Sequence, residues 1–159
     1  MEYQIRPAAV TDCEAIVSLI SGLAVYEHLE DQMINTPQRM EQVLFEEKAA
    51  RAMVCEADGA VVGYCIYFYS YSTFIGKKGI WLEDLYVLPE YRGHGIGKAF
   101  FKALADTALN EDCMRLEWSV LNWNAPSIAF YEKLGSVAMS DWHTRRLDRS
   151  GIENLVKKL

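Results

Sequence analysis

The chain has 159 residues, of which 51% are hydrophobic and 24% are charged. This composition is typical of a globular protein with its own core, so we expect a single domain over residues 1–159. The formal net charge of -6 argues against a nucleic-acid partner, which would require a basic face. No apolar run reaches transmembrane length, and the N-terminal MEYQIRPAAV lacks a secretory signal. We therefore expect no membrane partner and a cytoplasmic location.

The cysteines and histidines are scattered along the chain. No CxxC or HxxxH spacing occurs among them, so we expect no structural metal site. The cysteines also stand in apolar segments, which is typical of reduced thiols in a core rather than of a disulfide framework. They are Cys13, Cys55, Cys65 and Cys113.

The first third of the chain reads as helical. Thr11 and Glu14 have the spacing of a capping box, and apolar residues recur at helical intervals over 16–23. We therefore expect a helix that begins at Thr11. Thr36 followed by Pro37 predicts the start of a second, short helix.

The apolar period then changes to that of strands. AMVCEAD and AVVGYCIYFYSY are rich in β-formers and meet at Asp58-Gly59, which predicts a hairpin with a two-residue turn. A further strand is expected in GIWLEDLYVL, where the alternation slips at Glu83-Asp84. Either both faces of this strand are buried, or a β-bulge interrupts it at that point.

The remaining chain alternates helix and strand. A helix follows residues 91–98, MRLEWSVL reads as a strand, and a helix capped by Asn124 ends at Gly135. Two short strands are expected around 136–148, followed by a last helix or turn capped by Ser150 with Glu153. This order predicts an α/β fold with a mixed sheet that is antiparallel early and contains one parallel crossover.

A glycine-rich loop stands between a strand and a helix. Residues 91–98 read YRGHGIGK, with Gly93, Gly95 and Gly97 two residues apart. Glycines let a backbone approach a phosphate, and a helix N-terminus favours an anion, although a tight turn would explain the glycines equally well. The spacing fits neither GxxxxGK[ST] nor GxGxxG, so it is not a standard nucleotide motif.

Four segments together carry a family resemblance. The loop Arg92-x-x-Gly95-x-Gly97 and the later WNAPSIAFYEKLG resemble the acetyl-CoA-binding core of the GNAT acetyltransferase superfamily. VYEHLED, YFYSYSTFIGK and WLEDLYVLPEYRGHGIG make the chain similar to its spermidine/spermine (diamine) N-acetyltransferase branch. The resemblance implies a GNAT fold, in which a twisted, mixed, mostly antiparallel sheet is flanked by helices and its splayed strands hold acetyl-CoA. It also implies a homodimer.

The resemblance implies where the coenzyme binds. The diphosphate would lie over the backbone N–H groups of residues 92–97, and the pantetheine arm would pair with the backbone of residues 85–87, where the strand splays from WSVL. Asn124 and Ser127 would contact the coenzyme and also cap their helix. The predicted coenzyme residues are Leu85, Tyr86, Val87, Arg92, Gly93, His94, Gly95, Ile96, Gly97, Lys98, Asn124, Pro126 and Ser127.

Direct transfer of an acetyl group to an amine needs a base for the amine and an acid for the departing thiolate. The resemblance places Tyr131 as the acid, although Ile128, Tyr131 and Leu134 also have the spacing of a core stripe. Glu83 is the candidate base, acting through a water, with Asp84 beside it. An ion pair or an edge position would also explain carboxylates inside an apolar strand, and which of the two faces the amine stays open.

The acceptor expected from the resemblance is a small cationic amine. Tyr26 and Glu27 match the substrate-contacting pair of the branch, and Glu83 and Asp84 complete the predicted amine site. Ser72 and Phe74 depart from the branch, whose polyamine enzymes carry an acidic residue and a tryptophan there. This leaves shorter diamines and thialysine-like amino acids open beside the polyamines. Acetylation of a protein or peptide, and a non-catalytic acyl-CoA sensor, are the competing functions.

Overall fold

The computed structural model describes all residues, 1–159. The chain forms two compact units, residues 1–119 and 120–159, which are described separately. The first unit holds the whole sheet and three α-helices, and the second holds two α-helices. No helix of the chain combines the length and the apolar character needed to cross a membrane.

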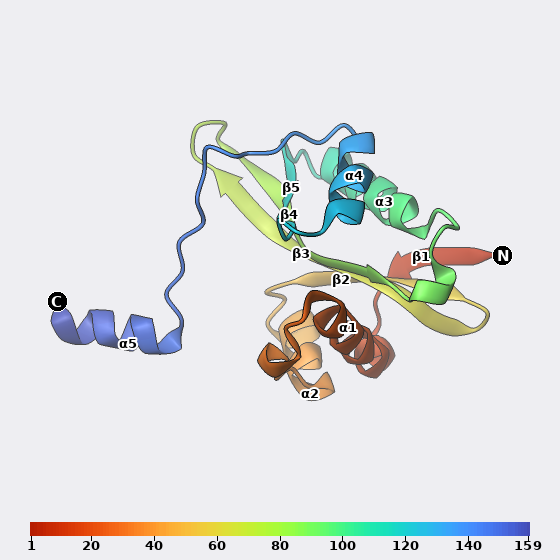
Figure 1. The fold of residues 1–159 in the computed structure, drawn as a ribbon, viewed down its shortest axis with the longest axis horizontal. Coiled ribbons are helices and arrows are strands. Elements are labelled where there is room, and N and C mark those ends of the chain that lie inside the picture. The colour runs from red at the N-terminus through yellow and green to blue at the C-terminus, as the bar shows by residue number, and fades with distance from the viewer. The chain divides into compact units, whose positions relative to one another are not determined.

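The first unit is built on a five-stranded sheet in the order β1-β2-β3-β4-β5 (Figure 1). Neighbouring strands are antiparallel except β5, which runs parallel to β4. The predicted mixed sheet is therefore confirmed. β1 is the one strand of the sheet that the sequence did not predict, because five residues ending in proline are too short to show a period. The strands are β1 (Tyr3–Pro7), β2 (Arg51–Ala57), β3 (Ala60–Ser72), β4 (Lys77–Val87) and β5 (Leu116–Trp118).

Two local features of the sheet follow the sequence. Asp58 and Gly59 connect β2 to β3 with φ of 51° and 76°, and positive φ at both central residues is what a two-residue hairpin turn requires. Across β3 and β4, Ile66 pairs with Asp84 but Tyr67 pairs with Leu82. Glu83 is therefore the extra residue of a β-bulge, which is one of the two explanations that the slipped alternation left open.

Helix α1 begins later than the sequence predicts. It spans Cys13–Glu27 and follows a 3-10 turn at Val10–Asp12, so the predicted capped start at Thr11 is wrong. The reason is that Asp12 fixes the 3-10 turn that precedes the helix. Its buried carboxylate accepts the backbone N–H of Ala9 at 2.7 Å.

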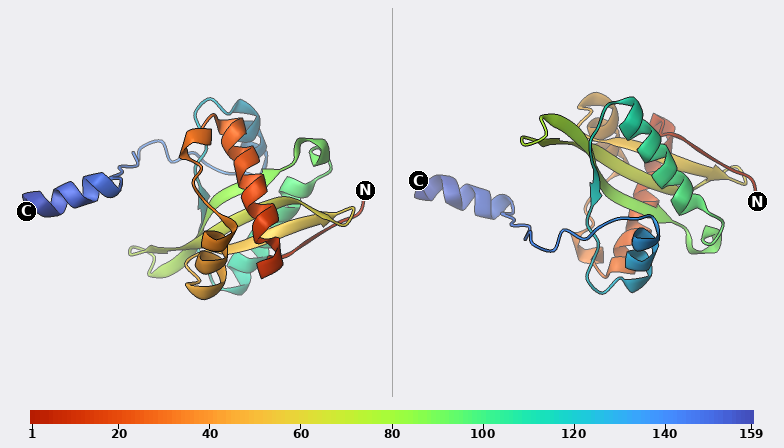
Figure 2. Two further views of the ribbon diagram at one scale, coloured as in Figure 1. Left: turned by 90° about the horizontal axis from the view of Figure 1, so that it is seen from below. Right: turned by 90° about the horizontal axis from the view of Figure 1, so that it is seen from above.

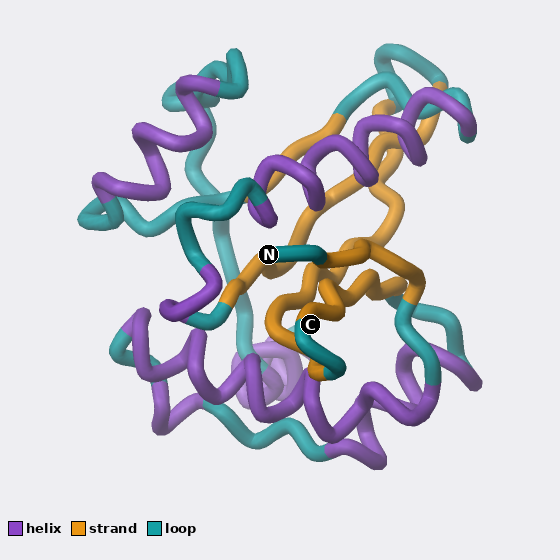
Figure 3. Tube along the Cα trace, turned by 90° about the vertical axis from the view of Figure 1, so that its right-hand side faces the viewer, coloured by secondary structure: helices purple, strands orange, loops and turns teal.

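Helices cover the two faces of the sheet. α1 and the short α2 (Pro37–Glu41) lie on one face, and α3 (Ile96–Asn110) lies on the other (Figures 2 and 3). The hydroxyl of Thr36 caps α2 as predicted, accepting the N–H of Arg39 at 3.2 Å. A π-helical turn, Gln42–Glu46, extends α2.

The first unit has apolar packing on both faces of its sheet. On the α1 face, Ile16 and Leu19 pack with β-strand side chains that include Tyr64 and Tyr86. On the other face, the fully buried Phe100 of α3 approaches β3 near Gly63. The four cysteines are buried and form no disulfide, which confirms the predicted core thiols.

The second unit contains α4 (Ala125–Lys133) and α5 (Arg149–Lys158). Asn124 caps α4 as predicted, because its side-chain oxygen accepts the N–H of Ser127 at 3.3 Å. The two strands expected within 136–148 are wrong, since this segment has no strand partner. The cap of α5 is Asp148 rather than Ser150, because the Asp148 carboxylate accepts the Gly151 N–H at 2.7 Å.

Candidate active site

The glycine-rich loop is shaped by left-handed backbone. Gly93 and Gly95 have φ of 82° and 85°, a region that side chains disfavour, and α3 begins directly afterwards at Ile96. A Cβ added at Gly93 would meet no atom within 4 Å, so this side of the loop is open. The first N–H groups of α3 have no acceptor within the helix. Loop and helix together therefore present backbone donors to an anion.

Arg92 fixes the loop instead of adding a backbone donor to it. Its N–H donates to the Pro89 carbonyl at 3.2 Å, so the donors available to an anion begin at Gly93. Its Nε donates to the Val87 carbonyl at 2.8 Å. The guanidinium lies 5.2 Å from the ring centre of Tyr86 and 5.5 Å from that of Tyr26. Arg92 therefore ties the loop to β4 and to the end of α1.

The second half of β4 has one open edge. β5 pairs with β4 only from Ile80 to Leu82, so residues 83–87 have no strand partner on that side. The side chains of Tyr86 and Val87 are buried, which leaves their backbone as the group that can pair with a ligand. This is the stretch predicted to hold an extended pantetheine arm.

The bulge gives Glu83 and Asp84 different surroundings. Glu83 is exposed, and its carboxylate accepts the indole N–H of Trp81 at 3.2 Å. Asp84 is half-buried on the face that α1 covers. The pKa of Asp84 is raised to about 6, first by burial and then by the negative charges of Glu83 and Glu27, while the Tyr64 hydroxyl lowers it. A carboxyl group with this pKa changes its charge close to neutral pH.

The end of α1 brings the predicted acceptor residues to the same place. Tyr26 packs against the core of the α1 face, and Glu27 lies close enough to Asp84 for their charges to interact. Burial raises the pKa of Glu27. Glu30 and Asp31 lie beyond the helix in an exposed 3-10 turn. Glu27 and Asp84 are therefore the two carboxylates that the fold brings together.

Tyr64 also lies beside Asp84 and Glu27, although no motif of the sequence indicated it. The residue is fully buried on β3, and its hydroxyl has no hydrogen-bond partner of normal geometry. Asp84 and Glu27 lie close enough to raise the pKa of Tyr64, after burial as the main cause. A tyrosine within VVGYCIY has the pattern of any core residue of a strand, so its position beside the two carboxylates could not be predicted locally.

The second unit carries the other predicted residues. Asn124 is buried at the start of α4, with Pro126 and Ser127 in the first turn. The ring of Tyr131 packs edge-on against Phe130 at 5.5 Å, and its carbonyl accepts the Ser136 hydroxyl at 2.9 Å. The coenzyme and acid roles of these residues stay predictions.

Comparison with known proteins identifies the family. Residues 22–136 match the Acetyltransferase (GNAT) family. The chain belongs to this family. It is 37% identical to a thialysine N-epsilon-acetyltransferase from Bos taurus over 97% of each chain. It is 30% identical to the human spermidine/spermine N(1)-acetyltransferase-like protein 1 over 92% of this chain and 23% of that protein. Among solved structures, an integron cassette protein of V. cholerae superposes with a TM-score of 0.83 at 23% identity, covering 99% of each chain, which shows the fold.

The predicted GNAT resemblance and the N-acetyltransferase activity are thereby confirmed, and acetyl-CoA is the acetyl donor of this acetyltransferase. The residues present fit that coenzyme. The loop at Gly93 is open on one side, and the N-terminus of α3 suits the diphosphate. The unpaired edge of residues 83–87 suits the amide groups of an extended pantetheine arm.

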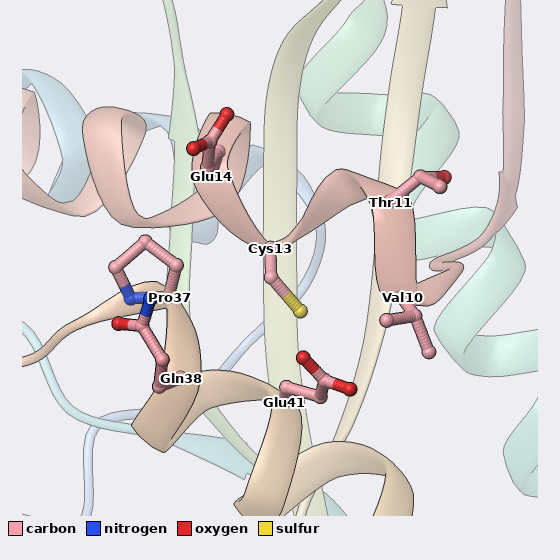
Figure 4. A pocket seen from close by; sticks show the side chains of 7 residues that line it. All are labelled: Val10, Thr11, Cys13, Glu14, Pro37, Gln38 and Glu41. Carbon is pink, nitrogen blue, oxygen red and sulfur yellow. The ribbon is translucent and has the colours of Figure 1, made fainter.

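A separate pocket of about 330 Å³ lies where the start of α1 meets α2 (Figure 4). Its lining includes Cys13, Glu14 and Glu41, and none of the predicted site residues. Burial and the charges of Glu41 and Asp12 raise the pKa of the Cys13 thiol. The thiol therefore stays protonated at neutral pH and is a poor nucleophile. Most of the residues predicted to bind the coenzyme lie instead along β4 and in the glycine-rich loop.

Proposed function

We propose that this acetyltransferase acetylates the primary amine of a small cationic acceptor, which is a diamine, a polyamine or a thialysine-like amino acid. The observation that carries the proposal is the pair of half-buried carboxylates, Glu27 and Asp84, beside the β4 bulge. Two carboxylates that are partly shielded from solvent attract an ammonium group more strongly than exposed ones do. The similarity to the thialysine N-epsilon-acetyltransferase from Bos taurus supports the same acceptor class.

Acetyl-CoA supplies an activated thioester. The chain's own part is to hold and orient it. The N–H groups from Gly93 onward would bind the diphosphate, and the unpaired β4 backbone would align the pantetheine arm. A backbone N–H on this edge is suited to donate to the thioester carbonyl oxygen, where negative charge develops during transfer.

Two side chains are proposed to accept and donate the protons of the reaction. The acceptor binds as an ammonium ion near Asp84 and Glu27, and it must lose a proton before its nitrogen attacks. Glu83, through a water, is the proposed proton acceptor, because the bulge turns its carboxylate away from the core. A new C–N bond then forms as the C–S bond breaks. The hydroxyl of Tyr131 is proposed to give the departing sulfur its proton.

The β3–β4 hairpin favours short acceptors. The Ser72 hydroxyl accepts the N–H of Ile75 at 3.4 Å, and Phe74 is 98% exposed. Neither residue offers a carboxylate to a distal ammonium group. We therefore expect short acceptors with two amino groups, with or without a carboxylate, to be preferred over spermine.

A homodimer in the cytoplasm is part of the proposal. α5 and the segment before it carry large apolar side chains that the second unit does not bury by itself, including Trp142, Val156 and Leu159. A second copy of the chain would cover them. The four buried thiols without disulfides are consistent with a reducing compartment. Sedimentation equilibrium tests the dimer: a mass near 36 kDa, about twice the 18.1 kDa of one chain, is expected.

A thiol-release assay tests the proposed reaction. Purified protein is incubated with acetyl-CoA and, in separate reactions, putrescine, cadaverine, spermidine, spermine, lysine, thialysine or a lysine-containing peptide. Release of free CoA with one small amine, well above the rate with the peptide, is expected. Faster turnover of the peptide would indicate a protein acetyltransferase. Coenzyme binding without thiol release from any acceptor would indicate a sensor.

A further inference from the structure

We propose that Tyr64 is a positioning residue of the amine site, where its hydroxyl donates a hydrogen bond to the Asp84 carboxylate and keeps it ionised and directed toward the acceptor. This inference rests on the proposed amine site. It adds a residue that no motif of the sequence indicates.

The sheet register brings the two residues together. Tyr64 pairs with Tyr86 and Ile66 pairs with Asp84 across β3 and β4. Because alternate residues of a strand share a face, Tyr64 and Asp84 are diagonal neighbours on the face that α1 covers. The hydroxyl is close enough to stabilise the ionised carboxylate, yet their hydrogen bond lacks normal geometry in the ligand-free chain. Such bonds often tighten only when the substrate binds.

The buried hydroxyl has a cost that packing does not explain. Tyr64 is fully buried and its oxygen finds no partner of normal geometry, which destabilises a folded protein relative to phenylalanine at the same position. A residue retained only to fill the core would be better without this oxygen. A hydroxyl beside Asp84 and Glu27 has a use when a cationic acceptor binds, because an ionised Asp84 attracts the acceptor and a protonated one does not.

Three neighbouring side chains affect the charge of Asp84. The charges of Glu83 and Glu27 favour the protonated form, and Tyr64 is the neighbour that favours the ionised form. Arg92 is occupied with the Val87 carbonyl and with two tyrosine rings. The titratable and charged groups facing this site are Glu83 and Tyr86 on β4, Tyr64 on β3, Tyr26 and Glu27 on α1, and Arg92 after β4.

The test is Tyr64→Phe, which removes one oxygen. We expect its midpoint of urea unfolding to be equal to or higher than that of the wild type. The apparent pKa of Asp84, followed by carboxyl-carbon NMR, should rise by about half to one unit because the stabilising hydroxyl is lost. Below pH 6 the amine KM should then rise about three- to tenfold, with kcat nearly unchanged.

Tyr67→Phe is the matched control. Tyr67 is also buried on β3, but it stands on the opposite face from Tyr64. Its replacement should leave both the Asp84 titration and the amine KM unchanged. An unmoved Asp84 titration in Tyr64→Phe would overturn the inference. If the wild type acetylates no small amine, the proposed function fails, and the NMR titration still decides whether Tyr64 controls Asp84.

Discussion

The two halves of the proposed site, one for the coenzyme and one for the amine, consist of different chemical groups. The coenzyme half, from β4 through the glycine-rich loop to α3, offers mainly backbone N–H and C=O groups. The amine half offers side chains from three elements, namely Glu27 on α1, Tyr64 on β3 and Asp84 on β4. A backbone site depends on chain conformation, whereas a side-chain site depends on chemical identity. The coenzyme half can therefore be shared by a family, while the amine half can change its acceptor by single substitutions.

The largest expected effects separate the two carboxylates of the bulge. Glu83→Gln should lower kcat about 100-fold, because it removes the proposed base. Asp84→Asn should instead raise the amine KM about 30-fold or more, because a half-buried charge partner of the ammonium group is lost. Steady-state kinetics with the best amine measures both, and each variant serves as the other's control. A reversed pattern would exchange the two roles.

On the coenzyme half, Gly93→Ala should weaken acetyl-CoA binding about 30-fold. The added methyl group would project into the open side of the loop, where the diphosphate is proposed to lie. Gly59→Ala is the matched control, since Gly59 also has positive φ and open surroundings but lies in the β2–β3 turn. The free energy of unfolding of both variants should fall by about 1–2 kcal/mol, because an alanine side chain disfavours the positive φ of both positions. Calorimetric titration showing equal affinity for both would remove the loop from the coenzyme site.

The amine half should also make stability depend on pH. A carboxyl group whose pKa is about 6 in the folded chain, above its ordinary value, binds its proton more tightly when folded. Its stabilising effect is complete at about pH 4 and is lost as the pH rises through 6. Asn does not titrate. Relative to the wild type, the free energy of unfolding of Asp84→Asn should therefore increase by about 1–2 kcal/mol when the pH is raised from 4 to 7. Urea unfolding of both proteins at both pH values checks this. The same difference in free energy of unfolding at pH 4 and pH 7 would contradict the raised pKa of Asp84.

The smallest expected effect concerns Arg92, which contacts both the glycine-rich loop's strand and the end of α1. Arg92→Lys loses the bond to the Val87 carbonyl and the stacking on Tyr26 and Tyr86. We expect about a fivefold weakening of acetyl-CoA binding together with a similar rise in the amine KM. A change in only one of the two constants would show that Arg92 does not couple them.

Features of the site that depend on the local chain could be predicted from the sequence, and those that depend on strand pairing could not. The glycine-rich loop, the Asp58-Gly59 turn and the bulge at Glu83 have local signatures, and the structure contains all three. Tyr64 had no such signature, because its closeness to Asp84 arises only when β3 pairs with β4. A hydroxyl brought into the site by strand register cannot be seen in a linear pattern.

The incorrect predictions have a related cause. The pattern of 136–148 suggested strands, but a strand needs a paired neighbour, and the segment has none in the chain. The start of α1 was misplaced because Asp12 pairs with Arg6, a residue of β1, and Arg6 lowers the pKa of that carboxyl. Local capping rules were overridden there by a contact between two elements.

The most direct test of the account is the pH dependence of kcat/KM for the best small amine between pH 5 and pH 8, with wild type and Asp84→Asn side by side. The account predicts that kcat/KM of the wild type falls below a pH near 6 while kcat changes little, and that this bend is absent from Asp84→Asn. A wild-type kcat/KM that is unchanged down to pH 5, or the same bend in both proteins, would contradict the assignment of Asp84 to the amine site.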